Sequence, residues 1–208
     1  MKTAQEALIG YLARIDSESR NMSAGGLLVA NRRGIPIEFR YTDPVEMSEP
    51  RHLLYEDDES RMAAVSLTIA ASLWKSLRQK PPILLMEEFS SARLWERIYK
   101  SGTAVAVHIS RARPRSMSAK AFPDGDGGSI YIQTVPPSDA ALDLASAQLT
   151  LAAKEMRIDE PFERVERILQ SLHDLPESEK RARESMKAAV AAASAGIGKR
   201  PDLEWLRR

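Results

Sequence analysis

The hydrophobic and polar positions of residues 25–42 form the clearest pattern in the chain. A short apolar run is followed by Asn31 and Gly34, two residues that tolerate a positive φ and favour a tight turn. After the turn, apolar and polar residues alternate with a period of two, which is typical of a strand with one buried face. The apolar positions are Ile35, Ile37, Phe39 and Tyr41. The pattern predicts a β-hairpin whose second strand packs these four side chains against the core.

Three later segments predict further strands. Residues 83–86 are entirely apolar, as in a central strand covered on both faces, and residues 103–109 are nearly so. Residues 129–135 alternate again and end at a Pro-Pro pair. Residues 111–128 have no apolar period and contain Pro, Ser and Gly, so we expect a long exposed loop there.

Helical spacing of apolar residues predicts helices around these strands. The predicted helices cover residues 3–16, 61–79, a segment that begins near Ser90 or Ser91, 138–157, a segment that begins at Pro161, and 177–195. Residues 17–24 would be a polar linker. The expected class is therefore α+β: a mixed sheet of about five strands with an early hairpin and helices on its faces. We expect a core domain over residues 1–136 and a C-terminal helical module over 137–208, packed on that core or extending from it.

Composition narrows the function classes. The net charge of the 208 residues is only +1, so binding to nucleic acid would need a local basic patch. The chain has no cysteine, which excludes disulfides, thiolate metal sites and cysteine nucleophiles. A signal peptide and an apolar run of about 20 residues are both missing, so we expect a cytoplasmic protein without a membrane span.

Two pairs of polar residues are candidate chemical sites. Glu38 and Arg40 share one face of the hairpin's second strand, in a spacing similar to the E-x-K of restriction-type nucleases. That chemistry needs an aspartate on a neighbouring strand, and residues 27–30 offer none. A cross-strand or surface ion pair is therefore the favoured interpretation. Glu87 and Glu88 follow the strand 83–86, at the end where α/β proteins bind ligands. Adjacent strand residues face opposite ways, and stabilisation of the next helix explains both carboxylates better.

No motif assigns a catalytic residue, a cofactor or a metal. The three histidines, His52, His108 and His173, do not have a metal-site spacing, and nucleotide-binding glycine loops are absent from the sequence. The residues Arg111, Arg113, Arg115 and Lys120 stand in a stretch without acidic residues. Arginine binds phosphate or carboxylate equally well, so this stretch predicts contact with nucleic acid, contact with an acidic protein surface, or a solvated loop.

Apolar anchors favour a protein partner or a homo-oligomer. Trp74 lies on the broad apolar stripe of the helix 61–79, and the charged tail carries Trp205 and Leu206. Such side chains commonly fill a groove in the same chain or on a partner.

The segment GGLLVANRRGIPIEFRYTDPV, followed by LLY and PPILLMEE, resembles a set of uncharacterised bacterial proteins. That resemblance implies a bacterial source and no assigned activity. The order of hairpin and then helix is also similar to profilin-like and roadblock-type domains, which implies an adaptor. Sequence alone thus favours a non-catalytic binding or scaffold subunit of a bacterial multi-protein assembly. The alternative is a nucleic-acid-binding accessory protein that uses residues 111–120. A third hypothesis is a metal-dependent nuclease built on Glu38, Glu87 or Glu88.

Overall fold

The computed structural model describes residues 7–17, 22–46, 58–87, 104–112, 114, 119–123 and 128–173. Several predictions lie outside these residues: the helices after Ser90 and over 177–195, and the residues Glu88, Arg113, Arg115, Trp205 and Leu206. Residues 1–170 form one compact unit and residues 171–208 a second. Within the described part, the helices are too short or too polar to cross a membrane.

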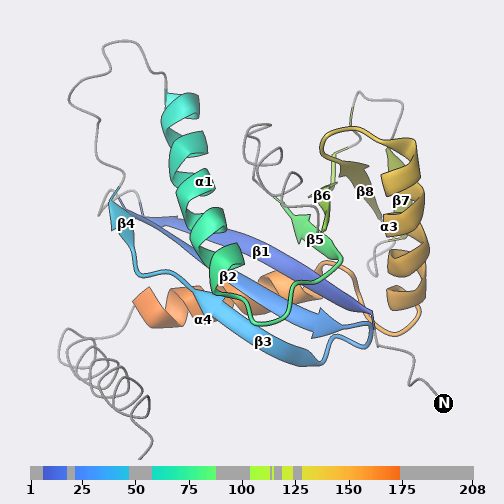
Figure 1. The fold of residues 1–208 in the computed structure, drawn as a ribbon, viewed down its shortest axis with the longest axis horizontal. Coiled ribbons are helices and arrows are strands. Elements are labelled where there is room, and N and C mark those ends of the chain that lie inside the picture. Colours follow the sequence, from blue (N-terminus) through green and yellow to red (C-terminus); the bar gives the residue numbers. More distant parts are fainter. Residues whose placement is uncertain are drawn as a thin grey trace, which may run out of the picture. The chain divides into compact units, whose positions relative to one another are not determined.

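A mixed sheet organises the first unit (Figure 1). Its strands lie in the order β3-β2-β1-β5-β6-β8-β7, and a short strand, β4, pairs with β2. Their bounds are β1 (Leu8–Ser17), β2 (Met22–Asn31), β3 (Pro36–Tyr41), β4 (Val45–Glu46), β5 (Ile83–Met86), β6 (Val105–Ser110), β7 (Lys120–Pro123) and β8 (Ser129–Thr134). The central strands β1, β5 and β6 are parallel, and the outer pairings are antiparallel. The α+β class is confirmed, but the sheet has seven strands in its main order rather than about five.

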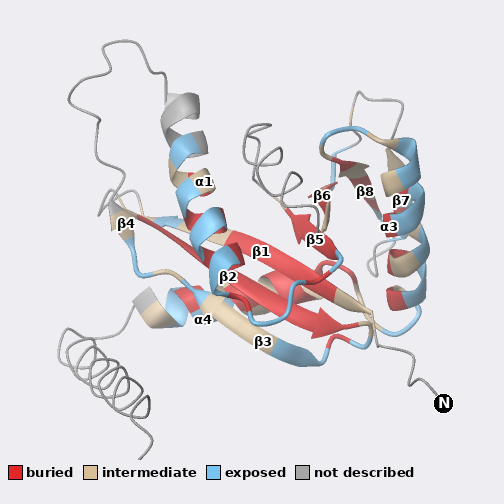
Figure 2. Ribbon diagram, in the orientation of Figure 1, coloured by how far each residue is buried: buried red, intermediate tan, exposed pale blue. Residues whose placement is uncertain are grey.

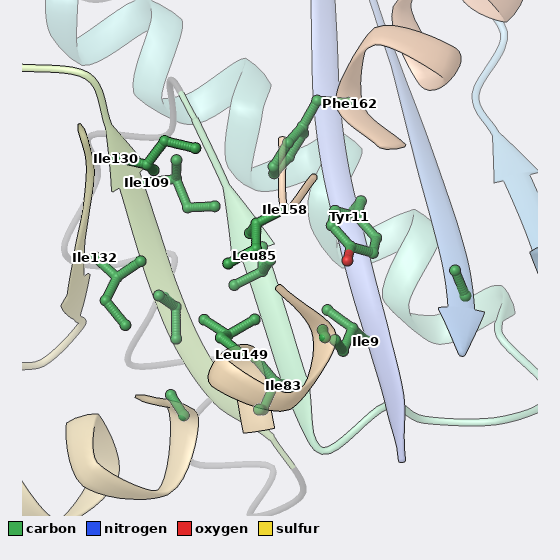
Figure 3. Packing of buried hydrophobic residues seen from close by; sticks show 14 of the residues in the cluster. Ile9, Tyr11, Ile83, Leu85, Ile109, Ile130, Ile132, Leu149, Ile158 and Phe162 are labelled. Carbon is green, nitrogen blue, oxygen red and sulfur yellow. The ribbon is translucent and has the colours of Figure 1, made fainter. Parts of the chain in front are cut away.

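Helices cover both faces of this sheet. On one face, α1 (Asp58–Ser76) packs Ile69, Leu73 and Trp74 against Leu27 of β2. On the other face, α3 (Asp139–Ala152) and α4 (Glu160–His173) share a cluster with the central strands. Figure 3 shows this second cluster, in which Tyr11 and Phe162 meet edge to face with their ring centroids 5.4 Å apart. The strands β2 and β5 are accordingly the most buried of the sheet (Figure 2).

Where a helix over 3–16 was predicted, residues 8–17 form the strand β1, and the predicted linker 17–24 contains the start of β2. Ten residues of β1 pair with ten of β2, from Leu8 opposite Asn31 to Ser17 opposite Met22. The helical spacing was misleading because β1 is covered on both faces, so apolar residues occupy consecutive positions. The two glycines of β2 allow helices to approach both faces of the strand. A Cβ on Gly25 would come within 2.2 Å of the Ile69 side chain of α1, and a Cβ on Gly26 within 2.7 Å of the Val165 side chain of α4.

The predicted hairpin turn is present, but most of its apolar row is exposed. The Asn31 side chain accepts hydrogen bonds from the backbone N–H groups of Arg33 and Ile35, each at 3.0 Å, and Gly34 has a φ of 74°. Of the row, only Phe39 packs against the core, whereas Ile35, Ile37 and Tyr41 are 52%, 49% and 38% exposed. β3 is the outermost strand of the sheet, so the core ends beneath it.

The predicted loop 111–128 contains the four-residue strand β7, which pairs with β8 at the other outer position of the sheet. One side chain of this strand, Phe122, is buried, and the strand ends at Pro123. A strand this short cannot show a period in the sequence.

Candidate nucleic-acid interface

The carboxyl ends of β1, β5 and β6 lie at one edge of the sheet because these neighbouring strands are parallel. Open α/β sheets bind ligands outside this edge. β6 ends at Ser110, and the next residue, Arg111, is the first of the predicted basic residues.

Arg111 is held by a buried carboxylate, Asp159, just before α4. The Nη2 atom of Arg111 donates to Asp159 Oδ2 at 2.8 Å. Arg157 donates to the same carboxylate through Nε at 3.2 Å and Nη2 at 3.0 Å. The Asp159 side chain is 4% exposed, whereas those of Arg111 and Arg157 are 63% and 36% exposed. The carboxylate is thus inside and the two guanidinium groups reach solvent.

The charge of this cluster favours anions. Burial pushes the pKa of Asp159 upward, but the hydrogen bond from Arg157 and the charges of Arg157 and Arg111 hold it below its usual range. Asp159 is therefore ionised at neutral pH. Glu163 adds a second carboxylate, which accepts from Arg157 at 3.3 Å and from Arg167 at 3.5 Å. Among the described pairs of this cluster, three arginines, Arg111, Arg157 and Arg167, face the two carboxylates of Asp159 and Glu163.

A second arginine–aspartate pair lies on the opposite face, under α1. Arg14 of β1 donates to Asp16 at 3.0 Å and to the hydroxyl of Ser66 on α1. Ser23 of β2 donates to the same aspartate at 2.6 Å. Here the arginine side chain is 8% exposed and that of Asp16 28%, so the cation is inside and the network fixes β1, β2 and α1 together.

Lys120, the last of the predicted basic residues, begins β7. Its Nζ donates to Asp143 of α3 at 2.7 Å. In the register of the sheet, Lys120 of β7 lies opposite Ile132 of β8, and Ile132 lies opposite Ile109 of β6. Lys120 is therefore near the same end of the sheet as Arg111. The two predicted basic residues that the structure describes thus lie near the same end of the sheet, each paired with a different aspartate.

Glu38 and Arg40 do form an ion pair, at 2.6 Å. The Glu38 carboxylate also accepts from the backbone N–H groups of Arg78, at 3.1 Å, and Gln79, at 3.3 Å. Burial acts to raise the pKa of Glu38, but these donors and Arg40 lower it overall. Glu38 therefore links β3 to the segment after α1 by hydrogen bonds. The sequence pattern did not reveal this link.

Of the remaining predicted residues, Glu87 stands at the same carboxyl edge of the sheet, and Trp74 lies away from it. Glu87 is half-buried and directly follows β5. Trp74 is 7% exposed and belongs to the core under α1, with the Lys80 Nζ 5.0 Å from its ring centroid. Nowhere in the described ranges do three Asp, Glu, His or Cys side chains gather as metal ligands.

The sequence analysis missed Arg157 and Asp159. An acidic residue just before a helix that contains an early proline is a signal for a helix N-terminus, and Asp159 fits it. Nothing local, however, connects Asp159 to Arg111, which is 48 residues away in the chain.

Neither a protein-family model nor a curated protein sequence matches this chain. Among solved structures, Endonuclease V from Streptomyces avermitilis matches with a TM-score of 0.55 and 14% identity, over 89% of this chain and 83% of that chain. Endonuclease V from Bacillus subtilis has a TM-score of 0.49 and 12% identity, over 80% and 81%. Argonaute from Marinitoga piezophila has a TM-score of 0.45 and 5% identity, over 72% of this chain and 26% of that chain.

The Streptomyces likeness corrects three expectations from the sequence: a scaffold function, a protein-interaction role and the absence of enzymatic activity. These rested on missing motifs, and a chain without a recognisable motif has folded like a protein named as an endonuclease. The similarity to uncharacterised bacterial proteins and to profilin-like domains stays a prediction. At 14% identity the likeness concerns the fold alone, and the conclusion it supports is that this chain shares the fold of an Endonuclease V.

Proposed function

We propose that this chain binds nucleic acid, as a protein of nucleic-acid processing, through the Arg111–Asp159–Arg157 cluster. One observation carries the proposal: a buried carboxylate orients two arginines whose guanidinium groups reach solvent at the carboxyl end of a central parallel strand. The likeness in fold to an Endonuclease V adds support. The proposal replaces the scaffold hypothesis and keeps the alternative that the sequence offered.

The arrangement suits phosphate better than a neutral ligand. A guanidinium group presents N–H donors in a planar fork that matches the oxygens of a phosphate. Asp159 fixes Arg111 and Arg157 before the ligand arrives, so less side-chain entropy is lost on binding. Such contacts to the phosphate backbone supply affinity without reading sequence.

The test is binding of fluorescein-labelled DNA and RNA, single- and double-stranded, measured by fluorescence anisotropy at several salt concentrations. We expect Arg111→Gln with Arg157→Gln to weaken binding and to lower the salt slope by about 1.4 for a single strand, since each lost phosphate contact lowers it by about 0.7. The matched control is Lys75→Gln with Arg78→Gln, which removes one exposed cation from the end of α1 and one from the segment after it. Equal losses in both double variants, or no binding by the parent chain, would refute the proposal.

The same complexes, incubated with Mg²⁺ or Mn²⁺ and run on a denaturing gel, measure strand cleavage. This experiment decides whether the processing role includes hydrolysis by the chain itself.

A further inference from the structure

A groove runs between the edge strand β7 and the helix α3. It has a volume of about 500 Å³, within the range of about 300–1,000 Å³ that is usual for ligand pockets. Its lining residues are Lys120, Ala121, Phe122 and Pro123 from β7, Ser146 and Thr150 from α3, and Ala153 and Lys154 just after α3. We propose that this groove holds the sugar–phosphate backbone of a single nucleic-acid strand. The inference rests on the proposed function and adds a second surface beside the arginine cluster.

The lining has the chemistry that a phosphate and its sugar need. Lys120 and Lys154 supply two cations. The hydroxyl of Ser146 supplies a donor, whereas Thr150 donates its proton to the backbone oxygen of Ser146, at 2.8 Å, and keeps acceptor capacity and a methyl group. Ala121 and Ala153 give the groove an apolar part that suits the carbons of a sugar ring.

The carboxylate of Asp143 partly neutralises the positive charge of Lys120 in the groove. Lys120 is ion-paired with Asp143, whose side chain is 72% exposed. An exposed ion pair of this kind contributes little stabilising free energy, so Lys120 can leave Asp143 and bind a phosphate with only a small loss. Asp143 then repels the bound strand, and its removal should tighten binding.

The groove continues the arginine cluster at the carboxyl end of β6. Lys120 stands two strand spacings, about 10 Å, from Ile109, and Arg111 follows two residues later. Lys154 and Arg157 belong to the same connection between α3 and α4 and are at most about 11 Å apart along the chain. Cations from both surfaces are thus close enough for a strand of a few nucleotides to touch them together.

The shape of the groove selects one strand over a duplex. Its walls are a helix and an edge strand. A duplex, whose major groove alone is about 12 Å wide, is far larger than a space of about 500 Å³ and could touch only its rim. A single strand exposes its backbone on all sides and can lie between the two walls.

The experiment measures binding of the full chain to a labelled 12-nucleotide single strand and to the duplex of the same sequence, by anisotropy. Lys120→Gln and Lys154→Gln should each weaken single-strand binding about fivefold at 0.1 M salt, which is the slope of about 0.7 applied over one decade of salt. Asp143→Asn should tighten it, and the control Lys75→Gln, on the helix of the opposite face, should leave it unchanged. Duplex binding should respond to none of these four substitutions.

Other results overturn the inference in distinguishable ways. If the two lysine variants behave like Lys75→Gln while Arg111→Gln still weakens binding, the proposed function stands and the groove does not contact the strand. If duplex binding falls as much as single-strand binding, the strand assignment is wrong. If a mononucleotide or inorganic phosphate competes at the affinity of the strand, the groove is a small-ligand site. If the parent chain binds no nucleic acid, the proposed function and this inference fail together.

Discussion

The two faces of the sheet carry the same pair of residue types in opposite arrangements. Under α1, the arginine is inside: the side chain of Arg14 is 8% exposed and that of Asp16 28%. At the carboxyl end of β6, the aspartate is inside: the side chain of Asp159 is 4% exposed and that of Arg111 63%. Which partner is buried decides whether an ion pair holds the protein together or presents a charge to a ligand.

The physical reason lies in the donors and acceptors left over. A buried arginine has five N–H donors to satisfy, so it binds several elements at once, as Arg14 does with Asp16 and with Ser66 of α1. A buried carboxylate can accept from two arginines and leave each of them reaching outward, as Asp159 does. The first network is suited to stability and the second to recognition, and the substitutions below test that division.

The largest effect is expected at Arg14. Arg14→Met keeps much of the volume but removes the buried cation, leaving Asp16 and Ser66 without this donor. Removing one partner of a fully buried pair costs roughly 3–5 kcal/mol of unfolding free energy. Because Asp16 is 28% exposed and keeps its hydrogen bond from Ser23, we expect a loss at the lower end of this range, about 3 kcal/mol. Urea melts measure it. A loss below about 1 kcal/mol would mean that the Arg14 network is not structural and would remove one side of the comparison.

Asp159 should come next, and its effect should depend on pH. Asp159→Asn removes the charge that accepts from Arg111 and Arg157, at a cost of about 1–3 kcal/mol near neutral pH. Its pKa is lower in the folded chain than the usual value of about 3.9, so between the two values the unfolded chain binds more protons. The stabilisation is therefore complete above about pH 5 and is lost as the pH falls through the lower, folded pKa.

Urea melts of the parent and Asp159→Asn chains at pH 7 and at progressively lower pH measure this difference. It should shrink on acidification. A difference that stays constant down to pH 2 would show that Asp159 contributes by packing and not as an ionised acceptor.

The contrast between the faces also explains what the sequence could reveal. Residues 83–86 are uniformly apolar because both faces of β5 are covered, and they were correctly predicted as a strand. β1 is covered on both faces too, but its ten residues are long enough to imitate a helical stripe. Arg111 was singled out by its local charge, yet its partner Asp159 is 48 residues away and became visible only when the chain folded. The local sequence pattern predicts secondary-structure elements and clusters of charge. A site formed by segments that are far apart in the chain can be recognised only in the tertiary structure.

Glu38 extends the comparison to a carboxylate with backbone donors. Its side chain is 11% exposed and accepts from Arg40 and from the N–H groups of Arg78 and Gln79. Glu38→Gln should cost about 1–2 kcal/mol of unfolding free energy, because an amide oxygen replaces an ionised acceptor. It should leave nucleic-acid binding unchanged, since no exposed cation depends on it for position at the β6 edge. A loss of affinity without a loss of stability in this variant would contradict the division drawn above.

The smallest change in stability is expected at Arg111, where the change in binding should be clear. The side chain is largely exposed, and Arg157 continues to pair with Asp159 after Arg111→Gln. Exposed ion pairs contribute about 0–1 kcal/mol, so the urea midpoint should move little while the affinity for a single strand falls about fivefold at 0.1 M salt. The measurement pairs a urea melt with an anisotropy titration on the same preparation. Arg14→Met, assayed beside it well below its melting point, should show the reverse: a large loss of stability and an unchanged salt slope. If both variants lose stability and affinity in the same proportion, burial of the cation does not separate the two roles, and the Arg111 cluster is a structural pair like the one under α1.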